Sequence, residues 1–128
     1  MKPEMIFLLW AVALAFIQAV VAMVGAMQQV GLPALAGNRE NMPEISGWAG
    51  RAMRAHRNML ESLVLFAALL LVAQSLGKSN DMIVYGAQVF FWARVAYAGI
   101  YIVGLPWVRT GVWAVSVIGL LMIFLQLV

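Results

Sequence analysis

The segment from Arg51 to Glu61 holds the densest group of chemically active side chains in this sequence. It reads RAMRAHRNMLE and supplies arginines, a histidine, an amide and a carboxylate, directly before the apolar stretch 63–73. Guanidinium groups bind carboxylates through paired hydrogen bonds, and a carboxylate can accept a ligand's ammonium group. Because charge within a membrane segment is costly and rare, this combination predicts a polar binding pocket at the edge of a bilayer or within it.

Helical spacing gathers most of these side chains on one face. A helix turns by about 100° per residue, so four of them share a stripe: Arg51, Arg54, Asn58 and Glu61. Arg57 lies at the edge of this stripe, and His56 lies on the other side of the helix. A second stripe follows later in the chain, where Arg94, Tyr97 and Tyr101 share a face. Two such stripes on adjacent helices can face each other or a neighbouring subunit.

Together the stripes suit an anionic, peptide-like ligand with two carboxylates and one amine. Glutathione has these groups and also carries a thiol. A positive field favours the nucleophilic thiolate over the thiol. Arg109, near a helix terminus at the membrane surface, can supply that field, and Thr110 can donate a hydrogen bond. A lipophilic co-substrate would reach such a pocket from the bilayer.

The composition is that of an integral membrane protein. Of the 128 residues, 65% are hydrophobic and 10% are charged, whereas a soluble domain carries roughly 25% charged residues. Without cysteine there are no disulfides or thiolate metal sites, and a single histidine with few carboxylates does not favour a metal enzyme. The net charge of +3 suits lipid headgroups or a small anion, so we expect no nucleic-acid partner.

Four apolar runs are long enough to cross a bilayer as helices. They cover residues 5–27, 48–76, 82–105 and 112–128, separated by a polar loop at 31–44, a turn at 77–81 and a connection at 106–111. Ser46 is a candidate N-cap for the second span. We therefore expect an all-α, integral membrane four-helix bundle, a single domain over residues 1–128, with both termini on one side.

The basic residues indicate an orientation. Lys2 and Lys78 lie on the side of the termini, whereas the opposite side carries Arg39, Arg109 and the arginines of the second span. The positive-inside rule places the arginine-rich side in the cytoplasm.

Three segments resemble the MAPEG family, the membrane-associated proteins in eicosanoid and glutathione metabolism. The first is the 51–61 motif, and the second is ARVAYAGIY at 93–101, followed by Pro106 and then Arg109-Thr110. The third is the loop 37–43, with the run Gly-Asn-Arg-Glu-Asn ending at Asn41, which resembles the first loop of bacterial members. The likeness covers the whole chain.

The resemblance implies a homotrimer in the inner membrane of a bacterium, with glutathione bound between adjacent subunits near the cytoplasmic side. By motif, the implied glutathione contacts are Arg54, Arg57, Asn58, Glu61, Arg94, Tyr97 and Tyr101. Arg109 and Thr110 take the implied thiol-activating role. The implied function is that of a glutathione transferase or peroxidase acting on lipophilic electrophiles or lipid hydroperoxides. Tyr97 stands where the prostaglandin-synthase branch has histidine, so leukotriene and prostaglandin specificities do not carry over.

Other readings stay open. A non-catalytic scaffold or accessory protein could use the same pocket for glutathione or a lipid headgroup. A transporter is less well supported, because the polar stripes end about halfway along their spans. Arg57 and Glu61 also have the spacing of an ordinary helix ion pair. Arg51 could instead extend its side chain to the lipid headgroups as an anchor. The roles of His56 and Arg39 are undetermined.

Overall fold

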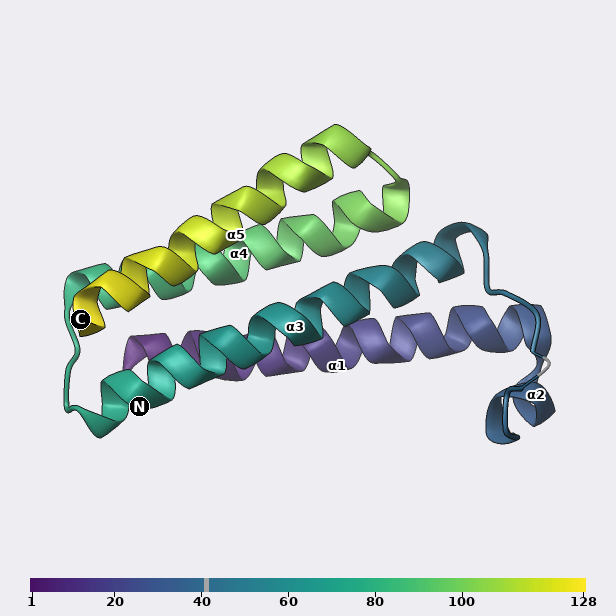
Figure 1. Cartoon of the computed structure of the whole chain (residues 1–128), viewed down its shortest axis with the longest axis horizontal. Coiled ribbons are helices and arrows are strands. Elements are labelled where there is room, and N and C mark those ends of the chain that lie inside the picture. The colour runs from purple at the N-terminus through teal and green to yellow at the C-terminus, as the bar shows by residue number, and fades with distance from the viewer. Residues whose placement is uncertain (41) are drawn as a thin grey trace.

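The computed structural model describes residues 1–40 and 42–128, and that part of the chain contains helices and no strands. Asn41, which belongs to the loop motif noted above, lies outside the described residues. In chain order the helices are α1 (Pro3–Val30), α2 (Leu32–Ala36), α3 (Gly47–Ser75), α4 (Asp81–Val103) and α5 (Pro106–Leu127) (Figure 1). The predicted all-α membrane bundle is confirmed.

The four longer helices are long and apolar enough to cross a membrane. Helices α4 and α5 contain 23 and 22 residues, which is about 33–35 Å at 1.5 Å per residue and close to the ~30 Å of a hydrocarbon core. Helices α1 and α3 are longer, with 28 and 29 residues. Both chain termini lie at the same end of the bundle, as predicted (Figure 1).

The predicted connection at 106–111 is wrong, because these residues form the first turns of α5. Pro106 stands at the first helical position, where its missing N–H removes no hydrogen bond and its fixed φ fits the helix. Helix α4 ends at Val103 and is capped by Gly104, whose φ of +92° is left-handed and suits glycine. The connection therefore shrinks to Gly104 and Leu105, and Arg109 and Thr110 lie on a helix.

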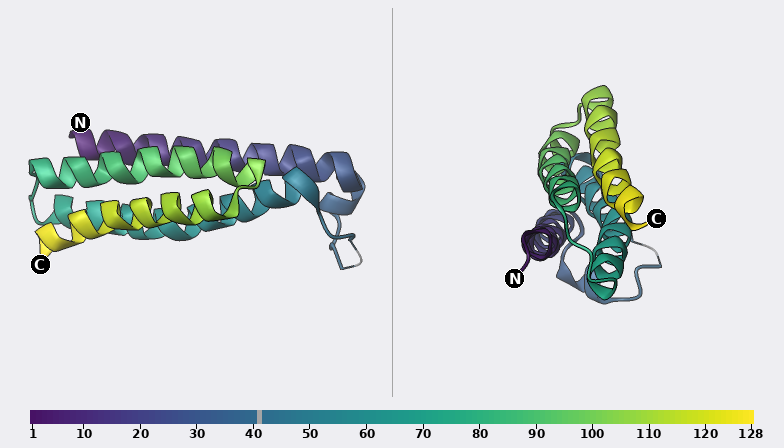
Figure 2. Two further views of the ribbon diagram at one scale, coloured as in Figure 1. Left: turned by 90° about the horizontal axis from the view of Figure 1, so that it is seen from above. Right: turned by 90° about the vertical axis from the view of Figure 1, so that its left-hand side faces the viewer.

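The helices pack as two pairs, α1 with α3 and α4 with α5 (Figures 1 and 2). The second pair is in close contact where Gly86 meets Gly119, since a Cβ on Gly119 would lie only 2.7 Å from the carbonyl oxygen of Gly86. Small residues at such points let helix backbones approach closely in a membrane. The two glycines therefore fix α4 and α5 as one unit.

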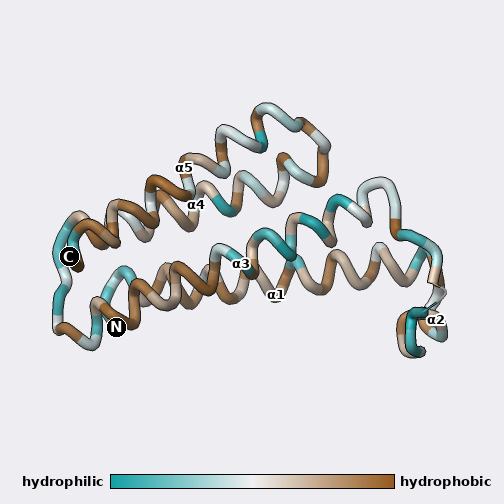
Figure 3. The backbone as a smooth tube through the Cα atoms, viewed as in Figure 1, coloured by the Kyte–Doolittle hydropathy of each residue, from teal (hydrophilic) through white to brown (hydrophobic). Residues whose placement is uncertain are grey.

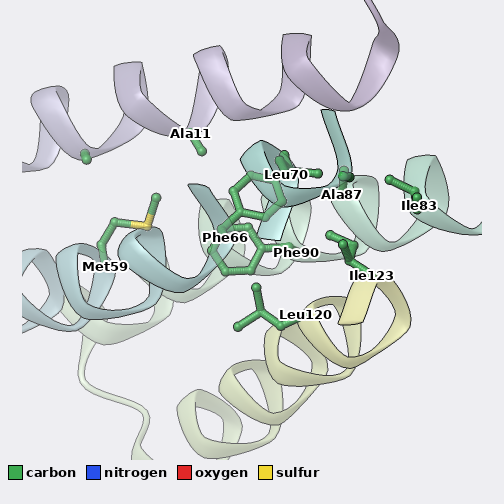
Figure 4. Packing of buried hydrophobic residues seen from close by; sticks show 11 residues of the cluster. Ala11, Met59, Phe66, Leu70, Ile83, Ala87, Phe90, Leu120 and Ile123 are labelled. Atoms are coloured by element: carbon green, nitrogen blue, oxygen red, sulfur yellow. The ribbon is translucent and has the colours of Figure 1, made fainter. Parts of the chain in front are cut away.

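An apolar core joins the two pairs in the half of the bundle nearest the termini. Phe66 of α3 stacks on Phe90 of α4, with ring centroids 4.1 Å apart. Ile123 and Leu120 of α5 pack into the same cluster (Figure 4). Phe66, Phe90 and Ile123 are fully buried, so this half of the bundle is closed by van der Waals contact.

Hydrophilic residues gather instead in the first half of α3, towards the end that bears α2 (Figure 3). Ser46 occupies the N-cap position of α3, but its side chain makes no capping hydrogen bond. Gln29 of α1 binds the backbone there instead: its Nε2 donates to the Ser46 carbonyl at 2.7 Å, and its Oε1 accepts from the Ser46 N–H at 3.0 Å. The start of α3 is thus tied to the end of α1.

Candidate functional site

Arg94 lies at the centre of the polar half of the bundle. Its side chain is 1% exposed, its Nη2 donates a 2.8 Å hydrogen bond to Oδ1 of Asn58 on α3, and its Cζ lies 4.1 Å from the ring centroid of Tyr97. Nε and Nη1 have no hydrogen-bond partner among the described residues. Leaving donors of a buried charged group unpaired is costly, so these two N–H groups can be satisfied by an added acceptor.

Aromatic rings continue this arrangement towards α5. Tyr97 meets Tyr101 edge to face, with centroids 5.5 Å apart. On the far side, Cζ of Arg109 lies 4.5 Å from the Tyr101 ring centroid. Cations over aromatic faces are stabilised by the ring quadrupole. Two guanidinium groups are therefore held at the two ends of a pair of tyrosines.

Arg54 connects α3 to this stack. Its Nε donates to the hydroxyl of Tyr101 at 3.3 Å, while the rest of the side chain is exposed. The contact confirms that the stripe of α3 faces the stripe of α4. The remaining donors of Arg54 stay accessible for an anion.

A pocket of about 190 Å³ opens beside these residues. Its lining combines three helices: Asn58 of α3, Tyr97 of α4, and Arg109, Thr110 and Trp113 of α5. Because α5 already begins at Pro106, Arg109, Thr110 and Trp113 all lie on the helix. Their spacing on it places them along one wall of the pocket. The pocket has a cation and an amide but no carboxylate in its lining.

The Thr110 hydroxyl is already engaged within the helix. Its Oγ1 donates to the carbonyl oxygen of Pro106 at 3.1 Å, the back-bond that threonine commonly makes four residues upstream in a helix. The hydroxyl hydrogen is therefore committed in this arrangement, and the oxygen lone pairs remain free to accept.

One of the predicted contacts, Arg57, lies outside this cluster within one chain. Glu61 is exposed on the stripe of α3, close enough to Tyr97 to act on it electrostatically. Arg57 lines a separate pocket of about 490 Å³ between α1, α2 and α3, together with His56 and Arg39. Its walls are otherwise mostly apolar. Arg57 therefore follows the α1 side of α3 rather than the α4 side.

Two residues have contacts that the sequence analysis did not predict. Trp113 lines the Arg109 pocket, and its spacing of four residues from Arg109 is the signal in the sequence that could have indicated this. Arg51 does not simply reach for headgroups, since its Nε donates to the Ile102 carbonyl of α4 at 2.8 Å.

The model of the MAPEG family matches residues 5–128 of this chain, nearly its whole length. Comparison with curated proteins gives no match, and neither does comparison with solved structures.

Proposed function

This chain belongs to the MAPEG family, and on that premise we propose that it is a membrane glutathione transferase or peroxidase acting on lipophilic electrophiles or lipid hydroperoxides. Glutathione supplies a thiol that, as thiolate, bonds to an electrophilic carbon and either displaces a leaving anion or opens a double bond whose other end then takes a proton. With a hydroperoxide, two thiols lose two electrons and two protons to give a disulfide, an alcohol and water. The protein's part is to bind the peptide, hold its thiol and favour loss of the thiol proton.

The observation that carries this proposal is the buried guanidinium of Arg94 with two unpaired donors. Nε and Nη1 are free, while Nη2 is fixed by Asn58. Each of these nitrogens can donate a charge-assisted hydrogen bond to a carboxylate oxygen of a ligand. Binding an anionic peptide would therefore satisfy donors that the described chain leaves without partners, which supports a carboxylate-bearing ligand at this point.

The other polar groups complete the match to a small peptide with one amine. Arg54 is exposed beside Tyr101 and can take a second carboxylate. Glu61 follows Asn58 on the same stripe of α3 and is exposed, so it can accept the ammonium group. The hydroxyl groups of Tyr97 and Tyr101 can bind the peptide backbone.

Arg109 is the residue we assign to thiol activation. It lies in the pocket wall, in the first turns of α5, with its guanidinium over Tyr101. A cation stabilises a thiolate more than a neutral thiol, and each unit by which a thiol pKa falls is about 1.36 kcal/mol. Thr110 is assigned an assisting role, because its hydroxyl hydrogen is held by Pro106.

We propose that the complete site is shared between the subunits of a homotrimer. Small-ligand pockets usually measure about 300–1,000 Å³, and the Arg109 pocket of one chain is about 190 Å³. A second basic surface lies around Arg57, His56 and Arg39, on the other side of α3. A neighbouring subunit that presents this surface would enlarge the pocket and give Arg57 a place at the ligand. Guanidinium groups facing lipid would otherwise be costly.

The proposed setting is the inner membrane of a bacterium, with the arginine-rich end in the cytoplasm. That end carries Arg39, Arg51, Arg54 and Arg109, which satisfies the positive-inside rule. Lipid-soluble co-substrates would enter between the helices from the bilayer, while glutathione would enter from the cytoplasm.

The test is a thiol titration of the detergent-purified protein. Adding glutathione at neutral pH should produce thiolate absorbance in the parent. In Arg109→Leu the bound thiol should have a higher pKa, so thiolate absorbance and conjugation of a small aromatic electrophile should fall about tenfold or more, while glutathione affinity changes less. Lys78→Leu, at the opposite end of the bundle, is the control. An unchanged thiolate signal in Arg109→Leu contradicts the assignment.

The trimer has its own test. Mass spectrometry from a gentle detergent should give a trimer of 14.0 kDa subunits, and each trimer should take up glutathione. Only monomers or dimers in that experiment would contradict a shared site.

A binding-only function is the second candidate, and one contact favours it. The Thr110–Pro106 hydrogen bond removes one thiol-directed donor from the pocket. If glutathione binds to the parent protein without any thiolate absorbance, the protein is an accessory or scaffold member that binds glutathione or a lipid headgroup.

A further inference from the structure

Arg51 lies outside the Arg109 pocket but holds the end of α4. Its Nε donates a 2.8 Å hydrogen bond to the carbonyl oxygen of Ile102, in the last turn of the helix. The last carbonyls of a helix have no partner within it, and a cation at that end is favoured by the helix dipole. Arg51 thus adds a cation from α3 to the glycine-capped end of α4, whose own last turn has no basic residue.

The corner that follows is a continuous run of hydrogen-bonded backbone. The Gly104 N–H donates to the Ile100 carbonyl at 2.9 Å, and the Arg109 N–H donates to the Leu105 carbonyl at 3.0 Å. Pro106, at the first position of α5, has a fixed φ. Little conformational freedom therefore separates Ile102 from Arg109, and a shift at the end of α4 is passed on to the first turn of α5.

The side chain of Arg51 also packs against Gly104. A Cβ on Gly104 would lie 3.5 Å from Nε and 3.6 Å from Cδ of Arg51. The arginine stem therefore runs directly over the glycine of the corner. Its left-handed φ of +92° also requires glycine for an unstrained backbone.

Few other bonds hold the two helix pairs together at this end. The Arg94–Asn58 bond lies deeper along α4, and the Arg54–Tyr101 bond is longer, at 3.3 Å, and exposed. The large apolar core is in the other half of the bundle. The corner depends chiefly on Arg51 for its position against α3.

We propose that Arg51 is a positioning residue for Arg109: by holding the Ile102 carbonyl and packing over Gly104, it sets the place of the α4–α5 corner and so keeps the Arg109 guanidinium over Tyr101 at the pocket. This rests on the proposed function insofar as Arg109 activates a thiol. The placement of Arg109 itself is independent of any chemistry.

The experiment compares Arg51→Met with Arg51→Lys in the full-length, detergent-purified protein. Methionine keeps an apolar stem without a donor, whereas lysine can still donate to the Ile102 carbonyl. The first readout is the rate at which a 1,2-dicarbonyl reagent modifies Arg109, measured by peptide mass spectrometry, with an added arginine-containing peptide as the reference. Arg109 should react at least about threefold faster in Arg51→Met, reflecting loss of a charged hydrogen bond, and near the parent rate in Arg51→Lys. Lys78→Met is the control variant.

The second readout is functional. With glutathione and a small aromatic electrophile, Arg51→Met should lower kcat and thiolate absorbance about tenfold, a change of about 1.4 kcal/mol, with glutathione Kd changed less than about threefold; Arg51→Lys should restore most of both. A merely structural role would reduce the amount of folded protein and leave thiolate per bound glutathione unchanged.

The outcomes separate the two proposals. Parent-like Arg109 reactivity in Arg51→Met overturns the positioning role. Faster reactivity combined with unchanged thiolate in an active protein supports that role and overturns the assignment of thiol activation to Arg109. If the parent shows no thiolate at all, the catalytic function falls, and the reactivity of Arg109 alone decides whether Arg51 places it.

Discussion

The two halves of this bundle are held together by different forces. Near the termini, Phe66 and Phe90 stack at 4.1 Å and Gly86 meets Gly119 backbone to backbone. Towards α2, the link between the same helices consists of single polar bonds, such as Arg94–Asn58. Lipid provides no hydrophobic drive between helices, so close packing must hold the first half. The second half lacks that close packing and instead has hydrogen-bond donors beside a pocket.

The apolar half should respond most strongly to loss of volume. Phe66→Ala removes a fully buried ring and leaves a cavity against Phe90. The free energy of unfolding should fall by about 3 kcal/mol. This is the low end for such changes, because the side chain is transferred from lipid rather than from water. Unfolding in mixed detergent measures it. Phe16→Ala, on a lipid-facing side chain that is 70% exposed, is the matched control and should change stability by less than about 1 kcal/mol.

The polar half should separate stability from binding. In Asn58→Leu, Arg94 loses its one side-chain acceptor, which should destabilise the protein by about 2 kcal/mol. Arg94→Met removes the buried charge itself, so stability should stay level or rise while glutathione affinity falls about tenfold or more. Isothermal titration and detergent unfolding on both variants decide this. Equal destabilisation by the two changes would contradict the idea that Arg94 is kept for binding.

An exposed residue on the ligand side should affect binding alone. Glu61→Gln removes the proposed ammonium partner, and glutathione affinity should fall about tenfold, because a hydrogen bond to a charged group contributes about 1.5–3 kcal/mol. Stability should not change, since the side chain is exposed. Glu44→Gln, in the loop before α3, serves as the control. Parent-like binding by Glu61→Gln would remove Glu61 from the site.

The smallest expected effect is that of Thr110→Ala. Since its hydroxyl donates to the Pro106 carbonyl, its loss should reduce thiolate formation less than about threefold, under about 0.7 kcal/mol. The same titration used for Arg109→Leu measures it. A loss as large as that of Arg109→Leu would assign the thiol-directed hydrogen bond to Thr110.

Much of this site could be predicted from helical geometry alone. The 3.6-residue repeat places Arg54 and Asn58 on one face of α3 and Arg94 with Tyr101 on one face of α4, and the hydrogen bonds between them follow once the two helices are adjacent. The repeat does not say which side of α3 receives α1. Arg57, at the edge of the stripe and assigned to the ligand by the family motif, lies in the pocket on the α1 side within one chain.

Helix ends were harder to predict, because their partners come from elsewhere in the chain. Ser46 occupies the N-cap position, yet its side chain makes no cap, and the bonds at this end join its backbone to Gln29 of α1. Pro106 was interpreted as part of a loop, although proline fits the first turn of a helix equally well. The hydrogen bond from Arg51 to the Ile102 carbonyl spans 51 positions of sequence, and no local pattern indicates it.

The unequal lengths of the two helix pairs have a consequence for the surrounding lipid. Helix α3 has 29 residues and α5 has 22, a difference of about 10 Å at 1.5 Å per residue, and at the end bearing α2 the α1–α3 pair projects beyond the α4–α5 corner (Figures 1 and 2). The extra length of α3 lies at its hydrophilic first half (Figure 3), which can extend into the headgroup region while the α4–α5 corner lies closer to the hydrocarbon core. Hydrophobic mismatch then acts at the first turn of α5, where Arg109 lies, and acyl-chain length in the host membrane becomes a physical control on the depth of that arginine.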